Sequence, residues 1–294
     1  MVVVGTSGRS SLKTILLATD FSSVSRIVLA HAVAVARRYK SKLYVAHVIP
    51  PDIYASVPAE ILQQAVKETR QHAHHEMSSL LRLGGLRRLR HQAVVEEGEV
   101  ADVLLRLAQE HAIDLLVIGT RGRRGVKRLL LGSVAEKVFR QARCPVLIVP
   151  PAAGEEVRIS RILYPTDFSK ASLQAAPYAF SLARHYGAKL ILLHVFEGTI
   201  HSVEALARRR TLVEKRLQRS VLRNVNLEVK PELTVEFGEA AERIRKAAAE
   251  WQVGLIVLAV RRGKPTSAHL AEGTAYKVVR QAPCPVLTVR RRSA

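Results

Sequence analysis

The sequence predicts an α/β protein built from two parallel, doubly wound sheets. Short runs of Val, Leu and Ile alternate with helical patterns along the whole chain. Strands that are apolar on both faces and joined by helices are typical of parallel sheets covered by helices on both sides. The alternation then occurs a second time, with matching residues at a nearly fixed distance. A length of 294 residues suits two domains, and a hydrophobic content of 48% is enough for two cores.

Several segments of the first half recur in the second. Residues 161–169 repeat residues 14–22 at a distance of 147, whereas residues 281–287 echo residues 141–147 at a distance of 140. The second copy is therefore seven residues shorter between its second strand and its glycine turn, where loop length changes easily. A period of this length indicates domain duplication rather than a solenoid. The predicted domains are residues 1–150 and 151–294, joined by a Pro- and Gly-containing linker around residues 150–156.

Each copy is expected to contribute five strands in the same order. In the first copy they are Ile15–Ala18, Leu43–Ile49, Gln92–Val95, Leu115–Ile118 and Val146–Val149. In the second copy they are Ile162–Tyr164, Leu190–Phe196, Val229–Val235, Leu255–Leu258 and Val286–Val289.

A glycine-containing loop follows the fourth strand of the first copy. Gly119 closes the strand, Gly122 follows in the loop, and nine residues later Gly132-Ser133 opens a helix. A strand, a Gly- and Arg-rich loop and a helix N-terminus together form an anion cradle, because free backbone N–H groups and the helix dipole favour a phosphate. The spacing is neither that of a Walker A loop nor that of a dinucleotide fingerprint. An ordinary βα loop with glycines at its turns is the alternative.

Three further segments of the sequence help to interpret this loop. The pattern Gly-x2-Gly-x9-Gly-Ser, followed by the strand that starts at Cys144-Pro145, resembles the ATP-binding signature and last strand of the universal stress protein family. Residues 15–22 resemble that family's first strand, and His47-Val48 the end of its second. The resemblance covers both halves and indicates the tandem form. It implies Rossmann-like (adenine nucleotide α-hydrolase-like) sheets of strand order 3-2-1-4-5, with the ligand at the carboxyl ends of the strands.

The resemblance also implies roles for residues of the first copy. Adenine would lie in an apolar slot, the nucleoside beside the end of the first strand, and the phosphates against the loop and the helix start. The resemblance places Val48 and Ile118 in the adenine slot, and Thr19 and Asp20 beside the nucleoside. The phosphates would meet Gly119, Gly122, Gly132, Ser133 and the N–H of Val134. Asp20 has a second interpretation, as the N-terminal cap of the following helix. The implied cofactor is ATP, with or without Mg.

The second copy departs from this pattern. Counted back from Cys284 without gaps, Ala259 stands where the first copy has Gly119. A shift of one residue restores Gly263 and Gly273-Thr274 but leaves Val260 in place of the first glycine. Asp167, Val195, Gly263, Gly273 and Thr274 remain candidates for a second site. We expect the first copy to bind ATP more tightly than the second.

Charge and cysteine content bound the function further. The net charge is +21; residues 1–150 contain 22 Lys and Arg against 12 Asp and Glu, and the remainder 24 against 13, so the two halves carry +10 and +11. Such a field attracts nucleic acid, anionic membrane or acidic protein, although a generally basic proteome or a solvated surface is the favoured explanation. Cys144 and Cys284 occupy equivalent strand starts and give no disulfide framework. Without a signal peptide or an apolar run of about 20 residues, the cytoplasm is the expected location and no membrane is expected to be a partner.

The leading interpretation is an ATP-binding regulator of the stress response. No catalytic base with an orienting group stands near the motif, so nucleotide binding with little or no turnover is expected. The alternatives are an interaction or nucleic-acid-binding stress factor that does not depend on ATP, and a slow ATPase. Protein partners are not identified by the sequence, and a homo-dimer is compatible with it.

Three other features carry expectations. The cluster His72-Ala73-His74-His75-Glu76 is interpreted as the solvated side of a helix rather than a metal site. Residues 208–223 form a basic amphipathic helix with Leu206, Val213, Leu217 and Val221 near one face, but without interleaved aromatic residues for base stacking. Pro177 is expected to kink the second copy's first helix, and His47 and His194 to be structural.

Overall fold

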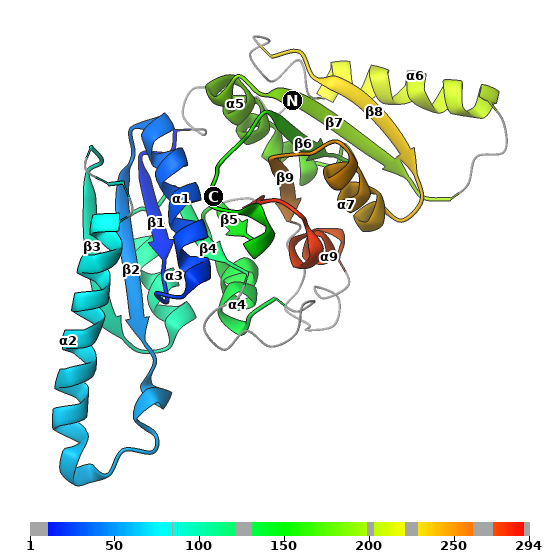
Figure 1. Ribbon diagram of the computed structural model, residues 1–294. Helices are drawn as coiled ribbons and strands as arrows, with labels where there is room; N and C mark the ends of the chain where they lie inside the picture. Colours follow the sequence, from blue (N-terminus) through cyan, green and yellow to red (C-terminus); the bar gives the residue numbers. More distant parts are fainter. Residues whose placement is uncertain are drawn as a thin grey trace. The chain divides into compact units, whose positions relative to one another are not determined.

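The protein is described by a computed structural model covering residues 11–83, 85–86, 88–120, 131–198, 203–220, 229–260 and 273–290 (Figure 1). The chain divides into two compact units. The amino-terminal unit spans Leu12–Val157, and the carboxy-terminal unit contains the chain from Arg158 onward.

The amino-terminal unit is a five-stranded parallel sheet of order β3-β2-β1-β4-β5. Its strands are β1 (Thr14–Ala18), β2 (Lys42–Ile49), β3 (His91–Glu97), β4 (Leu115–Gly119) and β5 (Val146–Val149). Its helices are α1 (Ser23–Tyr39), the short η1 (Pro51–Tyr54), α2 (Ala59–Leu83), α3 (Val100–Glu110), α4 (Ser133–Gln141) and the short η2 (Pro151–Ala153).

The carboxy-terminal unit repeats this order as β8-β7-β6-β9-β10. Its strands are β6 (Arg161–Pro165), β7 (Lys189–Phe196), β8 (Glu232–Phe237), β9 (Leu255–Val260) and β10 (Val286–Arg290). Its helices are the short η3 (Ser172–Ala175), α5 (Ala176–Tyr186), α6 (Val203–Ser220), α7 (Ala240–Glu250) and α9 (Thr274–Gln281). The predicted fold class, two Rossmann-like units with strand order 3-2-1-4-5, is confirmed.

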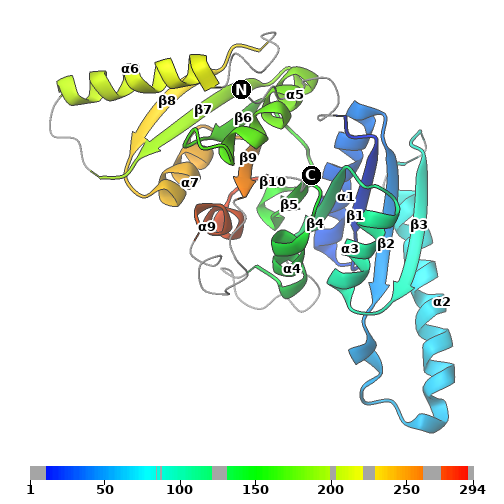
Figure 2. The same ribbon diagram turned by 180° about the vertical axis from the view of Figure 1, so that it is seen from behind.

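Helices cover both faces of each sheet. Right-handed crossovers place α1 and α2 on one face of the amino-terminal sheet and α3 and α4 on the other (Figures 1 and 2). The central strands are consequently buried on both sides, as Ile15, Leu16 and Leu17 show with no exposed surface. This explains why their sequences are continuous apolar runs rather than alternating ones. Within the described ranges, no helix has the length and apolar character needed to cross a membrane.

Two expectations for the second copy are wrong in detail. Its third strand begins at Glu232, not Val229, and follows Pro231, which has no N–H for the ladder. Pro177 does not kink a helix. The chain first makes the short η3, and α5 then begins at Ala176, so that Pro177 lies in the first helical turn. A first-turn N–H has no partner inside the helix, and proline is tolerated there.

Candidate functional site

The side chains of Thr19 and Asp20 stabilise the turn between β1 and α1. The Thr19 hydroxyl accepts the N–H of Phe21 at 3.2 Å, and Asp20 Oδ1 accepts the N–H of Ser22 at 3.0 Å. The Ser25 hydroxyl donates to the same Asp20 oxygen. These short-range bonds satisfy backbone N–H groups that neither strand nor helix can use. They also fix the Asp20 carboxylate at the carboxyl end of β1.

The cap of α1 is Ser22, not Asp20. The Ser22 hydroxyl accepts the N–H of Ser25 at 3.3 Å, and its backbone is extended, as a cap requires. Asp20 instead acts one step earlier, in the turn that leads to the cap. The alternative interpretation of Asp20 as the helix cap is therefore wrong, and its carboxylate serves the turn.

A histidine of β2 fastens this turn to the sheet. His47 Nδ1 lies 2.9 Å from the carbonyl oxygen of Thr19, which only accepts hydrogen bonds, so Nδ1 carries the proton. The His47 ring lies against Phe21, with 4.2 Å between ring centroids. Phe21 has a left-handed backbone, with φ at 60°, a conformation that costs a non-glycine residue about 1–2 kcal/mol. His47 is thus a structural histidine, as expected.

Strand register brings the predicted adenine residues to one face of the sheet. Ala18 pairs with Ala46, two residues before Val48, and Leu17 pairs with Val117, one residue before Ile118. Because paired residues point the same way and side chains alternate along a strand, Val48 and Ile118 lie on the same face, on either side of β1. Both residues are buried, with 5% and 6% of their surface exposed.

The start of α4 is tied to the end of β4. The Gly132 N–H donates to the carbonyl of Thr120 at 2.9 Å, and the Thr120 N–H donates to Val149 at 3.2 Å. Gly132 is the N-cap of α4 and has no side chain to cover the helix end. The first N–H groups of a helix have no acceptor within it, and the Gly132–Thr120 hydrogen bond holds the start of α4 at the end of β4. Gly122 and the rest of residues 121–130 lie outside the described residues.

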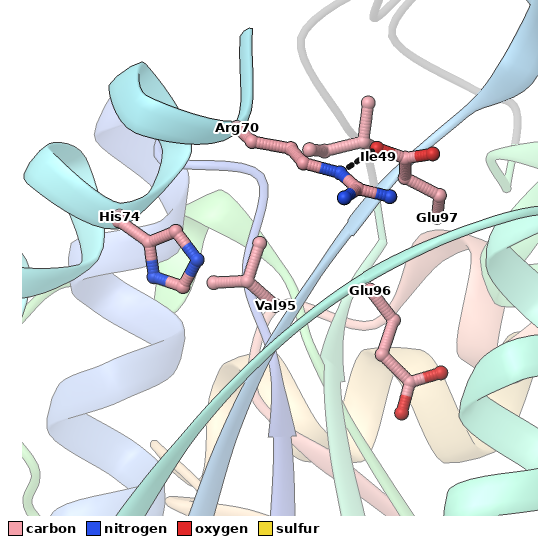
Figure 3. A pocket seen from close by; sticks show the side chains of 6 residues that line it. All are labelled: Ile49, Arg70, His74, Val95, Glu96 and Glu97. Carbon is pink, nitrogen blue, oxygen red and sulfur yellow. Dashed lines mark hydrogen bonds and ion pairs between the residues drawn. The ribbon is translucent and has the colours of Figure 1, made fainter. Parts of the chain in front are cut away.

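A pocket that the sequence did not predict lies at the carboxyl ends of β2 and β3. It has a volume of about 430 Å³ and is lined by Ile49, Arg70, His74, Val95, Glu96 and Glu97. Figure 3 shows Arg70 and His74 reaching from α2 toward the strands, with Arg70 Nε donating to a Glu97 oxygen at 2.5 Å. Glu96 points away from this pair, as alternation along β3 requires, and pairs with Arg106 of α3. Residues 95–99 (Val-Glu-Glu-Gly-Glu) recur in the second copy as Val-Glu-Phe-Gly-Glu at 235–239, and this partial repeat was the only sequence signal near the pocket.

The same turn is built again in the carboxy-terminal unit. Thr166 accepts the N–H of Phe168 at 3.0 Å, and Asp167 Oδ1 accepts that of Ser169 at 2.9 Å. Phe168 has φ at 57°, and His194 Nδ1 lies 2.7 Å from the Thr166 carbonyl oxygen. Burial lowers the pKa of His194 against the opposing effect of that carbonyl, and the charge of Arg216 lowers it further. His194 is therefore neutral at pH 7 and structural.

Strand pairing settles how the two glycine loops correspond. Gly119 pairs with Val149, and Ala259 pairs with Val289, which is 140 residues after Val149. Ala259 is thus the structural counterpart of Gly119. The helix start instead follows the alignment that is shifted by one residue, because Gly273 is the N-cap of α9 and Thr274 its first residue. The extra residue of the second copy lies between Ala259 and Gly273.

The remaining candidates of the second copy are partly described. Val195 lies in β7 at the position of Val48 and is partly exposed. Phe168, which follows Asp167, is also partly exposed. Asp167 and Thr274 are exposed. Gly263 lies outside the described residues.

The histidines of α2 and the two cysteines are the other side chains that the sequence singled out. His72, His74 and His75 are exposed on α2, while Ala73 and Met77 of the same helix are buried. Cys144 and Cys284 are both buried and free. Burial raises the pKa of the Cys284 thiol to about 12, so that it stays protonated at pH 7.

Comparison with known proteins agrees with this architecture. The model of the "Universal stress protein family" matches the chain twice, over residues 11–150 and 158–290. A universal stress protein of Methanocaldococcus jannaschii is 33% identical over 147 residues, covering 49% of this chain and 85% of the relative. One from Thermus aquaticus is 36% identical over 138 residues, covering 47% and 98%. A universal stress protein structure from Archaeoglobus fulgidus superposes with a TM-score of 0.70 at 20% identity, covering 97% of this chain and all of the other, and so shows the shared fold. With the family model matching most of its length, the chain belongs to the universal stress protein family.

Proposed function

We propose that the amino-terminal unit binds ATP and that the protein is a nucleotide-dependent regulator of a stress response. The observation that carries the proposal is the geometry around Gly132. A side-chain-free N-cap and the first amides of α4 are tied by one hydrogen bond to the end of β4. Amides at a helix N-terminus, next to the helix dipole, are suited to a phosphate.

The other parts of the site fit a nucleotide as well. Val48 and Ile118 share one face of the sheet on either side of β1 and would contact the adenine. Thr19 and Asp20 stand at the end of β1 between them, where Asp20 would accept from a ribose hydroxyl or the adenine amine. Gly119, Gly122, Gly132, Ser133 and Val134 would hold the phosphates. The cation that commonly accompanies ATP would be bound through those phosphates.

Regulation would follow from the place of the phosphates. Gly119 and Gly132, which would contact the phosphates, flank the connection between β4 and α4, so a bound triphosphate would alter the contacts of this part of the chain with a partner protein. We place the activity in the cytoplasm. The second unit is proposed to bind nucleotide weakly, because the Cβ of Ala259 stands where Gly119 allows close approach.

The test compares the two N-cap glycines. Gly132 has φ −62° and ψ 150°, and Gly273 has φ −66° and ψ 142°, a conformation that any residue adopts. Valine at either position therefore adds bulk without backbone strain. Wild-type protein should bind about one ATP per chain by titration calorimetry, and nucleotide released on denaturing the purified protein should be adenine nucleotide.

Gly132→Val should lower ATP affinity by at least about tenfold, since a clash of this kind typically costs 1–3 kcal/mol. Gly273→Val is the matched control and should bind as wild type does. Circular dichroism should show both variants folded. Unchanged binding by folded Gly132→Val, or an equal loss in Gly273→Val, would refute the assignment of the site.

A further inference from the structure

Two helices at matching positions of the duplication differ strongly in charge. Helix α2 connects β2 to β3 and carries three basic and three acidic residues. Helix α6 connects β7 to β8 and carries six basic and two acidic residues, a net charge of +4. Because the two helices have the same place in the fold, the fold does not account for the excess of positive charge on α6.

The positive charge of α6 faces solvent. Val213 and Leu217 are buried and fix the inward face of the helix, which lies beside β8 (Figures 1 and 2). The exposed basic side chains are those of Arg208, Arg210, Lys215, Arg216 and Arg219. Arg210 lies 3.4 Å from Glu214 of the same helix, an exposed pair that is easily exchanged for another anion.

A stacked aromatic pair lies under the same helix. Phe196 ends β7 and Phe237 ends β8, and their rings are stacked with centroids 5.6 Å apart and an interplanar angle of 13°. The Arg209 guanidinium lies 4.9 Å from the Phe196 centroid and 5.8 Å from that of Phe237. The His194 and Phe196 rings pack edge to face, with 4.6 Å between their centroids. Both rings and Arg209 are partly exposed.

Among the described residues of the first unit, no aromatic pair occupies the equivalent place. The counterparts of Phe196 and Phe237 by the duplication are Ile49 and Glu97, where Arg70 forms an ion pair and an open pocket remains. The aromatic pair was thus not dictated by the fold. Carboxylates of β8 do not cancel the positive surface, because Glu232 pairs with Lys189 and Glu236 with Arg243.

Exposed cations along α6 and a partly exposed aromatic pair next to Arg209 of the same helix match the chemistry of one kind of polyanion. Phosphates of a nucleic acid chain pair with exposed arginines, and an unpaired base stacks on an aromatic ring or a guanidinium plane. A duplex keeps its bases inside, so that they cannot stack on the rings, whereas an unpaired base uses the cations and the rings together. We propose that α6, together with Phe196 and Phe237, forms a binding surface for single-stranded nucleic acid.

The charge contribution is tested on the full-length protein with a fluorescent 20-nucleotide oligouridylate, by anisotropy over a range of salt. The variant Arg208→Gln/Arg219→Gln should bind about 20-fold more weakly near 0.1 M salt. The slope of log affinity against log salt should fall in magnitude by about 1.4, for two lost phosphate contacts on a single strand. The matched control, Lys67→Gln/Arg82→Gln, removes the same charge from α2 and should bind as wild type does. An equal loss in the control overturns the proposal, because total charge would then be responsible.

The ring contribution is tested with Phe237→Leu, which keeps an apolar side chain at a partly exposed position and removes the stacking surface. Its affinity for oligouridylate should fall about tenfold, as loss of one stacked base predicts. Inorganic polyphosphate, which has the charge and no bases, should compete poorly. Competition equal to that of oligouridylate, or equal affinity for a duplex of the same length, overturns the proposal.

The surface is independent of the proposed ATP site. Gly132→Val should retain oligouridylate binding, and Arg208→Gln/Arg219→Gln should retain ATP binding. Failure of one proposal therefore leaves the other standing. If folded wild-type protein does not bind oligouridylate at low salt, the surface has another purpose and this inference is wrong.

Discussion

Single residues distinguish two copies that otherwise share their turns. The Thr-Asp-Phe-Ser turn, the left-handed phenylalanine and the histidine bonded to the threonine carbonyl occur in both units with nearly the same distances. Gly119 and Ala259 differ by one Cβ at the end of the fourth strand, and this strand continues to Val260 in the second unit. A conserved scaffold with altered contact residues is what divergence of binding after duplication produces.

His194 gives the second unit a stability that depends on pH. Burial lowers its pKa below the unfolded value of about 6.5. The unfolded chain therefore takes up a proton first as the pH falls, and the stability present above pH 6.5 is lost progressively below it. The slope from this group is at most about 1.4 kcal/mol per pH unit.

His194→Asn places an amide N–H near the position of Nδ1 and cannot titrate. We expect it to be less stable than wild type at pH 7.5, since ring packing against Phe168 and Phe196 is lost. Between pH 6.5 and 5 its stability should fall less steeply. Urea unfolding at several pH values measures both effects, and a slope identical to that of wild type would contradict the assigned cause.

At the scale of elements, the two copies begin their first helices differently. Helix α1 starts at Ser23 with Ser22 as its cap, whereas the second copy inserts η3 and starts α5 only at Ala176. The serine hydroxyl accepts the Ser25 N–H in the first unit. In the second unit Ser169 accepts the N–H of Ser172, so the local bond is kept while the helix that follows is delayed.

Ser22→Ala should destabilise the amino-terminal unit by about 1 kcal/mol, the usual cost of losing an N-cap side chain. Ser23→Ala is the matched control, because Ser23 is the exposed first residue of the helix and alanine is a better helix former. Chemical denaturation of both variants measures the difference. Equal stability of Ser22→Ala and Ser23→Ala would show that the cap contributes little here.

The elements show what the sequence could and could not predict. Strands such as β4, predicted as Leu115–Ile118 and observed as Leu115–Gly119, were predictable because burial on both faces leaves a continuous apolar run. Strand order followed from the family resemblance. The residues 208–223 looked unable to stack bases because no aromatic residue stands among them. The rings come instead from Phe196 and Phe237, which only the pairing of β7 with β8 brings together. The pocket beside Arg70 was missed for the same reason, since α2 and β3 meet through tertiary packing.

At the scale of the whole molecule, the duplication allows one unit to change without loss of the other's function. The amino-terminal unit keeps the glycine at the end of its fourth strand and a neutral α2. The carboxy-terminal unit has Ala259 at the end of its fourth strand, and it has the basic helix α6 where the first unit has α2. The two proposals thus assign a nucleotide to one unit and a polynucleotide to the other.

Hydrogen exchange measured by mass spectrometry on the full-length chain tests this division directly. ATP should slow exchange in peptides that contain the β1–α1 turn and the start of α4, because bound ligand restrains the amides it contacts and lowers local opening. Peptides from the equivalent turn after β6 and from the start of α9 should exchange as before. Oligouridylate should instead slow exchange in α6 and leave α2 unaffected. Equal protection of both units by ATP would show that Ala259 does not weaken the second site, and protection of α2 by oligouridylate would show that the charge difference between the helices has no consequence for binding.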